Sequence, residues 1–205
     1  LVHKATHHFD LVNFWLNTEP EKVFALGSLN FYGKEAAEKR GVEKFYYRCH
    51  GQESAKGDPF AIDMETNPTL KALYLDAEAD NGYIRDRSVF RDDISIEDTM
   101  NVIVKYKNGV QMSYSLFSYS PWEGFNVCIN GSAGRIEYTA LEKPYINAGG
   151  DKSGEGATVY HKIRVCPMFG EAYEVPVETR AGGHGGGDPA LLDDVFLPCP
   201  SHDEF

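Results

Sequence analysis

Apolar residues near the start of the chain recur at a helical period and predict a helix over residues 6–17. Intervals of three and four residues place five side chains on one broad face, namely His8, Leu11, Val12, Trp15 and Leu16. The pair Asn17-Thr18, followed by Pro20, is a typical helix end. Residues 22–32 alternate loosely between apolar and polar positions and are rich in strand formers, so we predict a strand that ends before Gly33.

Residues 33–98 form a long polar connection with only short apolar pieces and with Gly and Pro punctuation. We expect two small helical stretches in it, over residues 34–40 and 69–77. A connection of this length is either a surface insertion packed on the core, which is the plainer interpretation, or a functional segment such as a lid.

From residue 99 onward the pattern becomes a meander of strands. Asn108-Gly109 lies between two alternating runs, which is the strongest short hairpin signal. A second tight turn, Gly131-Ser132-Ala133-Gly134, separates strands predicted over residues 125–130 and 135–139; further strands cover 157–165 and 172–177, and a helix begins near Asp188-Pro189. One early helix followed by hairpin-linked strands predicts an α+β fold with a large, open, mostly antiparallel sheet and helices on one face.

Composition and charge narrow the classes of partner. The 205 residues suit one domain or, less comfortably, two small ones, and 31 Asp and Glu against 20 Lys and Arg give a net charge of −11. Such a surface repels nucleic acid and anionic membranes on average, and no apolar run approaches the ~18 residues of a membrane span. The four cysteines show no metal-binding spacing, so we expect buried free thiols and no metal site.

Both ends of the sequence look like cuts inside a longer polypeptide. Residue 1 is Leu, no signal peptide follows it, and no helix-terminating signal precedes the last residue. We expect a cytoplasmic protein, and a periplasmic location stays open because a targeting segment would lie upstream of Leu1.

The densest group of chemically capable side chains lies at the start of the chain. If the helix extends back to His3, then His3, His7 and Asp10 share a face away from the apolar one, with Lys4 nearby. A histidine one turn from a carboxylate suits proton transfer at neutral pH. Metal binding by His3 and His7 is the alternative, although no third ligand has a recognisable spacing. His8 falls on the apolar face and is expected to be a packed, hydrogen-bonded core residue.

Two further segments could contact a ligand. His184 lies among five glycines that would let the backbone approach a ligand closely, or else it is solvent-exposed in a flexible connection. Trp122 lies in a loop between strands, where it could stack on a sugar ring or cover the edge of the core.

Four segments together, in order and spacing, resemble the C-terminal domain of the oxidoreductase family named for glucose–fructose oxidoreductase, inositol dehydrogenase and MocA (Gfo/Idh/MocA): HKATHHFDLVNFWL, LYLDAEADNGYIRDRSVFRDDISIEDTMNVIVKYKNGVQMSYSL, INGSAGRIE and GGHGGGDPALLDDVF. The resemblance implies a parent enzyme with an N-terminal Rossmann domain, which would precede Leu1 and bind NAD or NADP. The family's catalytic lysine lies in a Glu-Lys-Pro motif of that domain, so we regard Glu142-Lys143-Pro144 here as a coincidence.

The resemblance also implies roles for individual residues. Many members carry Asp-x-x-x-His-x-x-Asp on the first helix of this domain, and His7 and Asp10 match while His3 replaces the first Asp. We therefore assign His7 to proton transfer, and with the segments named above we expect His3, Lys4, Asp10, Trp122 and His184 to bind the substrate. Related sequences often carry several cysteines near Cys49, where Gln52 and Asp58 stand here, so no metal is expected in the insertion.

The resemblance predicts the substrate-binding and oligomerisation domain of an NAD- or NADP-dependent dehydrogenase acting on a sugar, polyol or derivative. Two alternatives remain: an NAD-dependent glycosidase of the same superfamily, and a non-enzymatic carbohydrate-binding or scaffold domain. We also expect a homo-oligomer built through an exposed apolar sheet face, formed by Val102, Val104 and Tyr106 with Met112, Tyr114 and Leu116.

Overall fold

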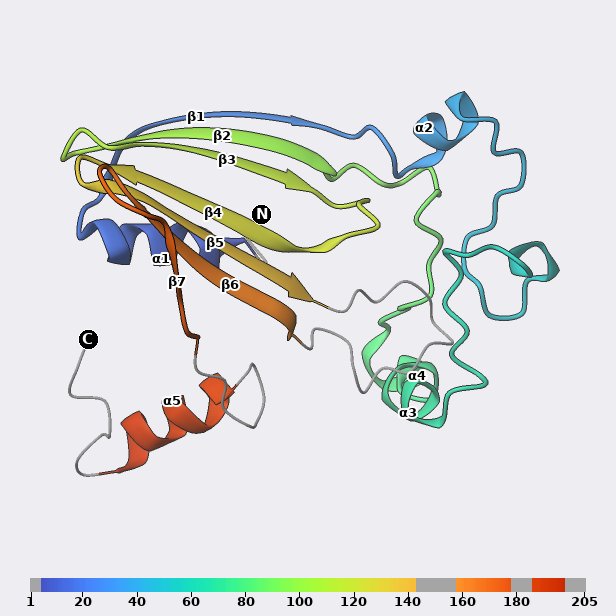
Figure 1. The fold of residues 1–205 in the computed structure, drawn as a ribbon. Helices are drawn as coiled ribbons and strands as arrows, with labels where there is room; N and C mark the ends of the chain where they lie inside the picture. The colour runs from blue at the N-terminus through green and yellow to red at the C-terminus, as the bar shows by residue number, and fades with distance from the viewer. Residues whose placement is uncertain (1–4, 143–157, 178–185, 198–205) are drawn as a thin grey trace. The chain divides into compact units, whose positions relative to one another are not determined.

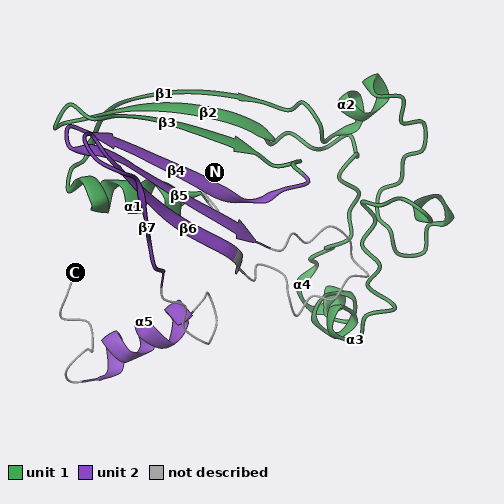
Figure 2. Cartoon of the chain, viewed as in Figure 1, with its two compact units in different colours: residues 1–120 green, residues 121–205 purple. Residues whose placement is uncertain are grey.

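The computed structural model describes residues 5–142, 158–177 and 186–197. The chain divides into two compact units, residues 1–120 and 121–205, shown in green and purple in Figure 2. Each unit contains its own antiparallel sheet.

A three-stranded sheet with the order β1-β2-β3 forms the centre of the first unit (Figure 1). Its strands are β1 (Pro20–Ser28), β2 (Thr99–Tyr106) and β3 (Gln111–Phe117). The predicted hairpin joins β2 to β3, and the Gly109 N–H donates to the Tyr106 carbonyl at 3.0 Å. Gly109 has a φ of 89°, a left-handed conformation that only glycine adopts without steric strain, and this is why the Asn-Gly pair marked the turn correctly.

Helix α1 (Thr6–Leu16) packs on one face of this sheet and ends at Asn17, as predicted. Three of its side chains, spaced three and four residues apart, pack against the buried residues of β2: Phe9, Val12 and Leu16. The predicted apolar face is therefore partly wrong, because Leu11 and Trp15 are 41% and 46% exposed. Each residue advances a helix by about 100°, so the contact made by Phe9 rotates α1 away from the face centred on Leu11 and Trp15.

The same packing corrects the predicted oligomerisation face. Val102, Val104 and Tyr106 alternate along β2 and are at most 5% exposed, because they form the core cluster beneath α1. Met112 and Tyr114 of β3 pack against that cluster, so these side chains do not form an open face. The opposite face of the sheet presents four large apolar side chains that are more than half exposed: Phe24, Leu26, Ile103 and Phe117.

Residues 29–98 connect β1 to β2 and contain the insertion. The described helices there are α2 (Lys34–Lys39), η1 (Glu53–Ala55), α3 (Pro68–Leu70), η2 (Lys71–Leu75) and α4 (Glu78–Asn81). Both predicted helical stretches are confirmed, and the second one continues from α3 into η2, a π-helical turn. Five apolar residues of the insertion are buried: Ala37, Ala55, Met64, Leu70 and Phe90.

Asp98 joins the insertion to the sheet at the start of β2. Its carboxylate accepts hydrogen bonds from the backbone N–H groups of Asn30, Phe31 and Tyr32, at 2.9, 2.7 and 2.9 Å. These bonds fold the chain back after Ser28, so β1 ends four residues before the predicted Tyr32. Burial by itself would raise the pKa of Asp98, but the three backbone donors hold the pKa below its ordinary value.

The second unit contains a four-stranded antiparallel sheet with the order β4-β5-β6-β7 and one described helix. Its elements are β4 (Glu123–Gly131), β5 (Gly134–Glu142), β6 (Thr158–Pro167), β7 (Tyr173–Val175) and α5 (Gly187–Phe196). Gly134 has a φ of 153°, and a Cβ at this position would lie 2.3 Å from the carbonyl oxygen of Cys166. Glycine is therefore required where the second predicted turn enters β5.

The α+β class with open antiparallel sheets is confirmed, and so are the strands expected after residue 99. The described strands form two hydrogen-bonded sheets rather than one large sheet, with the division between β3 and β4. Helix α5 begins at Gly187, one residue before the predicted Asp188.

Asp98→Asn should lower the free energy of unfolding by about 2 kcal/mol at neutral pH, because hydrogen bonds to a charged group contribute about 1.5–3 kcal/mol. The pKa of Asp98 is lowered in the folded state, so its stabilisation is present above the unfolded carboxyl pKa of about 3.9. That stabilisation is lost as the pH falls through the folded-state pKa. Urea unfolding at neutral and acidic pH should show the difference between wild type and variant shrinking on acidification.

The matched control is the exposed neighbour Asp92. Asp92→Asn should change the free energy of unfolding by no more than about 0.5 kcal/mol at either pH. A destabilisation by Asp98→Asn that stays constant with pH would contradict the role given to the Asp98 charge.

Candidate functional site

His7 and Asp10 lie on the exposed side of α1, as their spacing predicted. The three side chains that pack on the sheet define one side of the helix, and at about 100° per residue His7, Asp10 and Phe14 fall on the opposite side. Phe14 is 67% exposed. An imidazole, a carboxylate and an aromatic ring therefore project from one exposed helix face.

Phe14 was not predicted as part of the site. The signal was present in the spacing, because Phe14 lies seven residues after His7 and four after Asp10. Phe14 was assigned no role, and it lies outside the predicted apolar face, which consists of His8, Leu11, Val12, Trp15 and Leu16.

His8 is held against the sheet, as predicted. Its Nδ1 lies 2.9 Å from the hydroxyl of Tyr114 on β3, and the two rings are tilted with their centroids 5.7 Å apart. Burial raises the pKa of Tyr114, so its hydroxyl keeps its proton at neutral pH and can donate to Nδ1. His8 is thus anchored while the adjacent His7 remains exposed.

The other predicted substrate-binding residues lie either outside the described residues or in the second unit. His3, Lys4 and His184 lie outside the described residues. Trp122 belongs to the second unit, where it is 41% exposed and its ring lies beside Gly124. His7 and Asp10 are therefore the two predicted site residues that one described element positions together.

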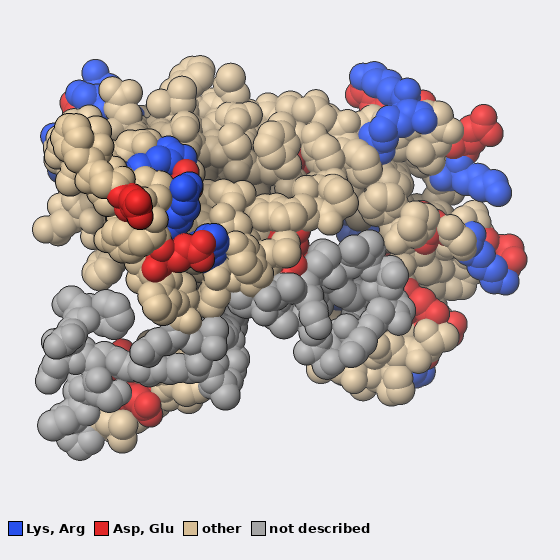
Figure 3. All heavy atoms as spheres, viewed as in Figure 1, with Lys and Arg blue, Asp and Glu red and all other residues tan. Residues whose placement is uncertain are grey.

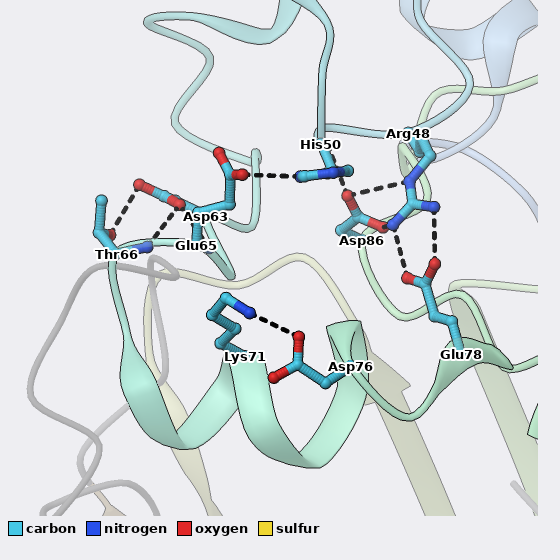
Figure 4. Close-up of polar contacts among 9 residues, drawn as sticks. All are labelled: Arg48, His50, Asp63, Glu65, Thr66, Lys71, Asp76, Glu78 and Asp86. Carbon is cyan, nitrogen blue, oxygen red and sulfur yellow. Dashed lines mark hydrogen bonds and ion pairs between the residues drawn. The ribbon is translucent and has the colours of Figure 1, made fainter. Parts of the chain in front are cut away.

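A second polar cluster lies in the insertion and is built around Arg48 (Figure 4). The Arg48 guanidinium donates to both carboxylate oxygens of Glu78, at 2.9 and 2.6 Å, and its Nη2 also lies 2.8 Å from Oδ1 of the fully buried Asp86. Asp86 in turn accepts a hydrogen bond from the backbone N–H of His50 at 2.6 Å. The positive charge is satisfied by two carboxylates, so this cluster ties three segments of the insertion together and leaves Arg48 no free donor pair for a ligand.

Cys49 lies beside this cluster and is a poor nucleophile. Burial, and then the negative charges of Asp86, Asp63 and Asp58, raise the pKa of the Cys49 thiol. Because the thiolate is the reactive form, this environment disfavours covalent catalysis. The described cysteines are all free, as expected, but Cys49 and Cys166 are only partly buried, and Cys128 is exposed, so the expectation of a buried thiol is wrong at Cys128.

The structure offers few signs of other ligand classes. Within the described ranges, no three His, Cys, Asp or Glu side chains are grouped so that they could hold a metal ion. No described helix is long and apolar enough to cross a membrane. On the face shown in Figure 3, Lys and Arg side chains lie among Asp and Glu side chains rather than in a continuous basic field.

Comparison with known proteins identifies the family to which the chain belongs. Residues 1–202 match the family described as "Oxidoreductase family, C-terminal alpha/beta domain". The chain is also 37% identical over 205 aligned residues to the Bacillus subtilis (strain 168) protein named "Putative oxidoreductase YteT". That alignment covers 96% of this chain and 46% of YteT, so the chain spans somewhat less than half the length of this relative. The chain therefore belongs to the Gfo/Idh/MocA oxidoreductase family, as its C-terminal α/β domain.

Proposed function

We propose that this chain is the substrate-binding domain of an NAD- or NADP-dependent oxidoreductase that acts on a sugar, polyol or related derivative. The observation that carries the proposal is the orientation of α1, which exposes His7 and Asp10 together while His8 is held by Tyr114. Membership of an oxidoreductase family supports the redox chemistry. A carboxylate that can bind hydroxyl groups, beside an aromatic ring that can contact a sugar ring, supports the substrate class.

The described residues of this chain do not fit a nicotinamide dinucleotide. A dinucleotide site of the Rossmann type needs a buried strand, a glycine-rich turn and a helix N-terminus in succession. The strand before the glycine-rich run here is β7, which has three residues, all of them exposed. We therefore assign the cofactor to a separate domain of the full-length enzyme, where it would supply the hydride acceptor.

His7 supplies the matching proton step. Oxidation of a secondary alcohol to a ketone removes a hydride from carbon and a proton from oxygen, and His7 takes the proton from the hydroxyl onto an imidazole nitrogen. Histidine suits this exchange because its charge changes near neutral pH. Asp10, on the same exposed side of the helix, binds a neighbouring hydroxyl and orients the substrate.

His7→Ala in the full-length enzyme should lower kcat by ~10²–10⁴-fold, the usual effect of losing a positioned acid–base group. The affinity for the dinucleotide should hardly change, because that cofactor contacts the other domain. Steady-state kinetics and a dinucleotide titration would measure both quantities.

His8→Ala is the matched control, since it removes the adjacent imidazole. It should lower stability by about 1 kcal/mol or more through loss of the hydrogen bond to Tyr114, while turnover of the folded fraction stays near normal. If His8→Ala abolishes turnover at an unchanged melting temperature and His7→Ala does not, then His8 rather than His7 faces the substrate and the proposed role of His7 is wrong. Product analysis of the wild type separates the glycosidase alternative, which would release an aglycone without net formation of NADH or NADPH.

The isolated 205-residue chain should show no appreciable binding of NAD(H) or NADP(H) by calorimetry. The physical reason is the lack of a phosphate-binding turn in the described part of the chain. Dinucleotide binding to the isolated chain at micromolar concentration would contradict the assignment of the cofactor to a separate domain.

We propose further that the protein forms a homo-oligomer through the exposed face of β1 and β2, where Phe24 pairs with Ile103. Phe24→Lys should shift the full-length protein to smaller species in light scattering, because it puts a charge into an apolar interface. Val23→Lys is the matched control: Val23 is equally exposed, at 62%, but points to the other face of the same strand. Equal effects of the two variants, or a wild type that is monomeric at high concentration, would contradict this interface.

A further inference from the structure

Three arginines line a small pocket in the insertion. The pocket has a volume of about 270 Å³ and is lined by Gly82, Tyr83, Ile84, Arg85, Arg87 and Arg91. No acidic side chain is among these lining residues, in a chain whose net charge is −11. The lining includes no residue of α1, so the pocket is not part of the exposed face that carries His7.

Arg85 and Arg87 are not neutralised within the described structure. The ion pairs nearby join Arg48 to Glu78 and Asp86, and Arg91 to Asp93, and they leave Arg85 and Arg87 without a carboxylate among the described residues. The Nε atoms of Arg85 and Arg87 are buried and reach no hydrogen-bond acceptor in the described part of the chain. Buried donors without acceptors destabilise a fold, so two unsatisfied N–H donors that line one pocket favour the binding of an acceptor group there.

Aromatic rings orient both guanidinium groups. The Cζ of Arg85 lies 4.4 Å from the ring centroid of Tyr74, and the Cζ of Arg87 lies 5.3 Å from that of Tyr47. A stacked ring occupies one face of a guanidinium group, whereas the N–H donors lie along its edge. Each stack therefore limits the motion of the side chain without using the donors that bind an anion.

Arg91 has a different role. Its Nη1 donates to the carbonyl of Ser88 at 2.9 Å, and its Nε is paired with Asp93. Arg91 therefore forms part of the wall, and the uncompensated positive charge of the pocket comes from Arg85 and Arg87.

We propose that this pocket binds the phosphate or carboxylate group of a small organic anion, with Arg85 and Arg87 as the donors. The guanidinium fork matches the oxygen arrangement of both groups and can bind either of them through two parallel hydrogen bonds. The pocket is slightly smaller than the roughly 300 Å³ at which ordinary small-molecule sites begin, which fits one anionic group with a small carbon skeleton. The site stands on its own geometry and does not depend on the role proposed for His7.

The test is calorimetric titration of the full-length protein with glucose 6-phosphate, D-glucuronate and D-glucose, in the absence of any dinucleotide. At least one of the two anions should bind, more weakly as the salt concentration rises, and any binding of neutral glucose at the substrate site should not depend on Arg85 or Arg87. The two anionic arms decide between a phosphate and a carboxylate ligand. The double variant Arg85→Gln/Arg87→Gln should weaken binding of the anion by about tenfold or more, because charge-assisted hydrogen bonds are lost.

Arg164→Gln, which removes one positive charge in β6, is the control for the change in overall charge and should leave the affinity unchanged. If the double glutamine variant has a lowered melting temperature, Arg85→Lys/Arg87→Lys keeps the charge and removes the fork, and it should still weaken binding several-fold. The proposal is overturned if neither anion binds at millimolar concentration. It is equally overturned if the arginine variants bind the anions as the wild type does, or if they weaken the binding of glucose as much as that of the anions.

Discussion

The contact of α1 with β2 is the interaction on which the arrangement of the candidate site depends. Phe9, Val12 and Leu16 pack on the alternating core residues of β2, and this contact fixes the rotation of α1 about its own axis. Adjacent helix positions lie about 100° apart, so one of two neighbouring histidines must turn toward the sheet while the other is exposed. A different rotation of the helix would exchange the roles of His7 and His8 without any change in the sequence.

The insertion depends on carboxylates that are satisfied in two different ways. Asp98 is satisfied by three backbone N–H groups, so it fixes the direction of the chain where β1 ends. Asp86 is satisfied by Arg48 and by the backbone of His50, so it ties distant segments of the insertion together. Removing a partner of either carboxylate would leave a buried charge without compensation. The segment between residues 29 and 98 is therefore held by these directional contacts as well as by its few buried apolar residues.

Arg85 and Arg87 have no carboxylate partner among the described residues and so differ from the ion-paired arginines of the insertion. Arg48 and Arg91 have carboxylate partners in the insertion, whereas Arg85 and Arg87 contact aromatic rings and line a pocket. The contrast shows that the insertion does not merely fill space between two strands. Some of its charged residues form ion pairs that hold the fold, whereas Arg85 and Arg87 line a pocket.

The sequence by itself determined the elements whose signals are local. The Asn108-Gly109 hairpin, the turn at Gly134 and the end of α1 follow from backbone conformations that few residue types adopt, and alternation along β2 follows from the two-residue period of a strand. Tertiary structure alone decided which face each element buries: Phe9 displaced Leu11 and Trp15 from the core, and Val102 and Val104 became buried instead of forming an open face. Periodicity shows that an apolar face exists, but the packing partner decides where that face is centred, and the partner comes from about a hundred residues away in the chain.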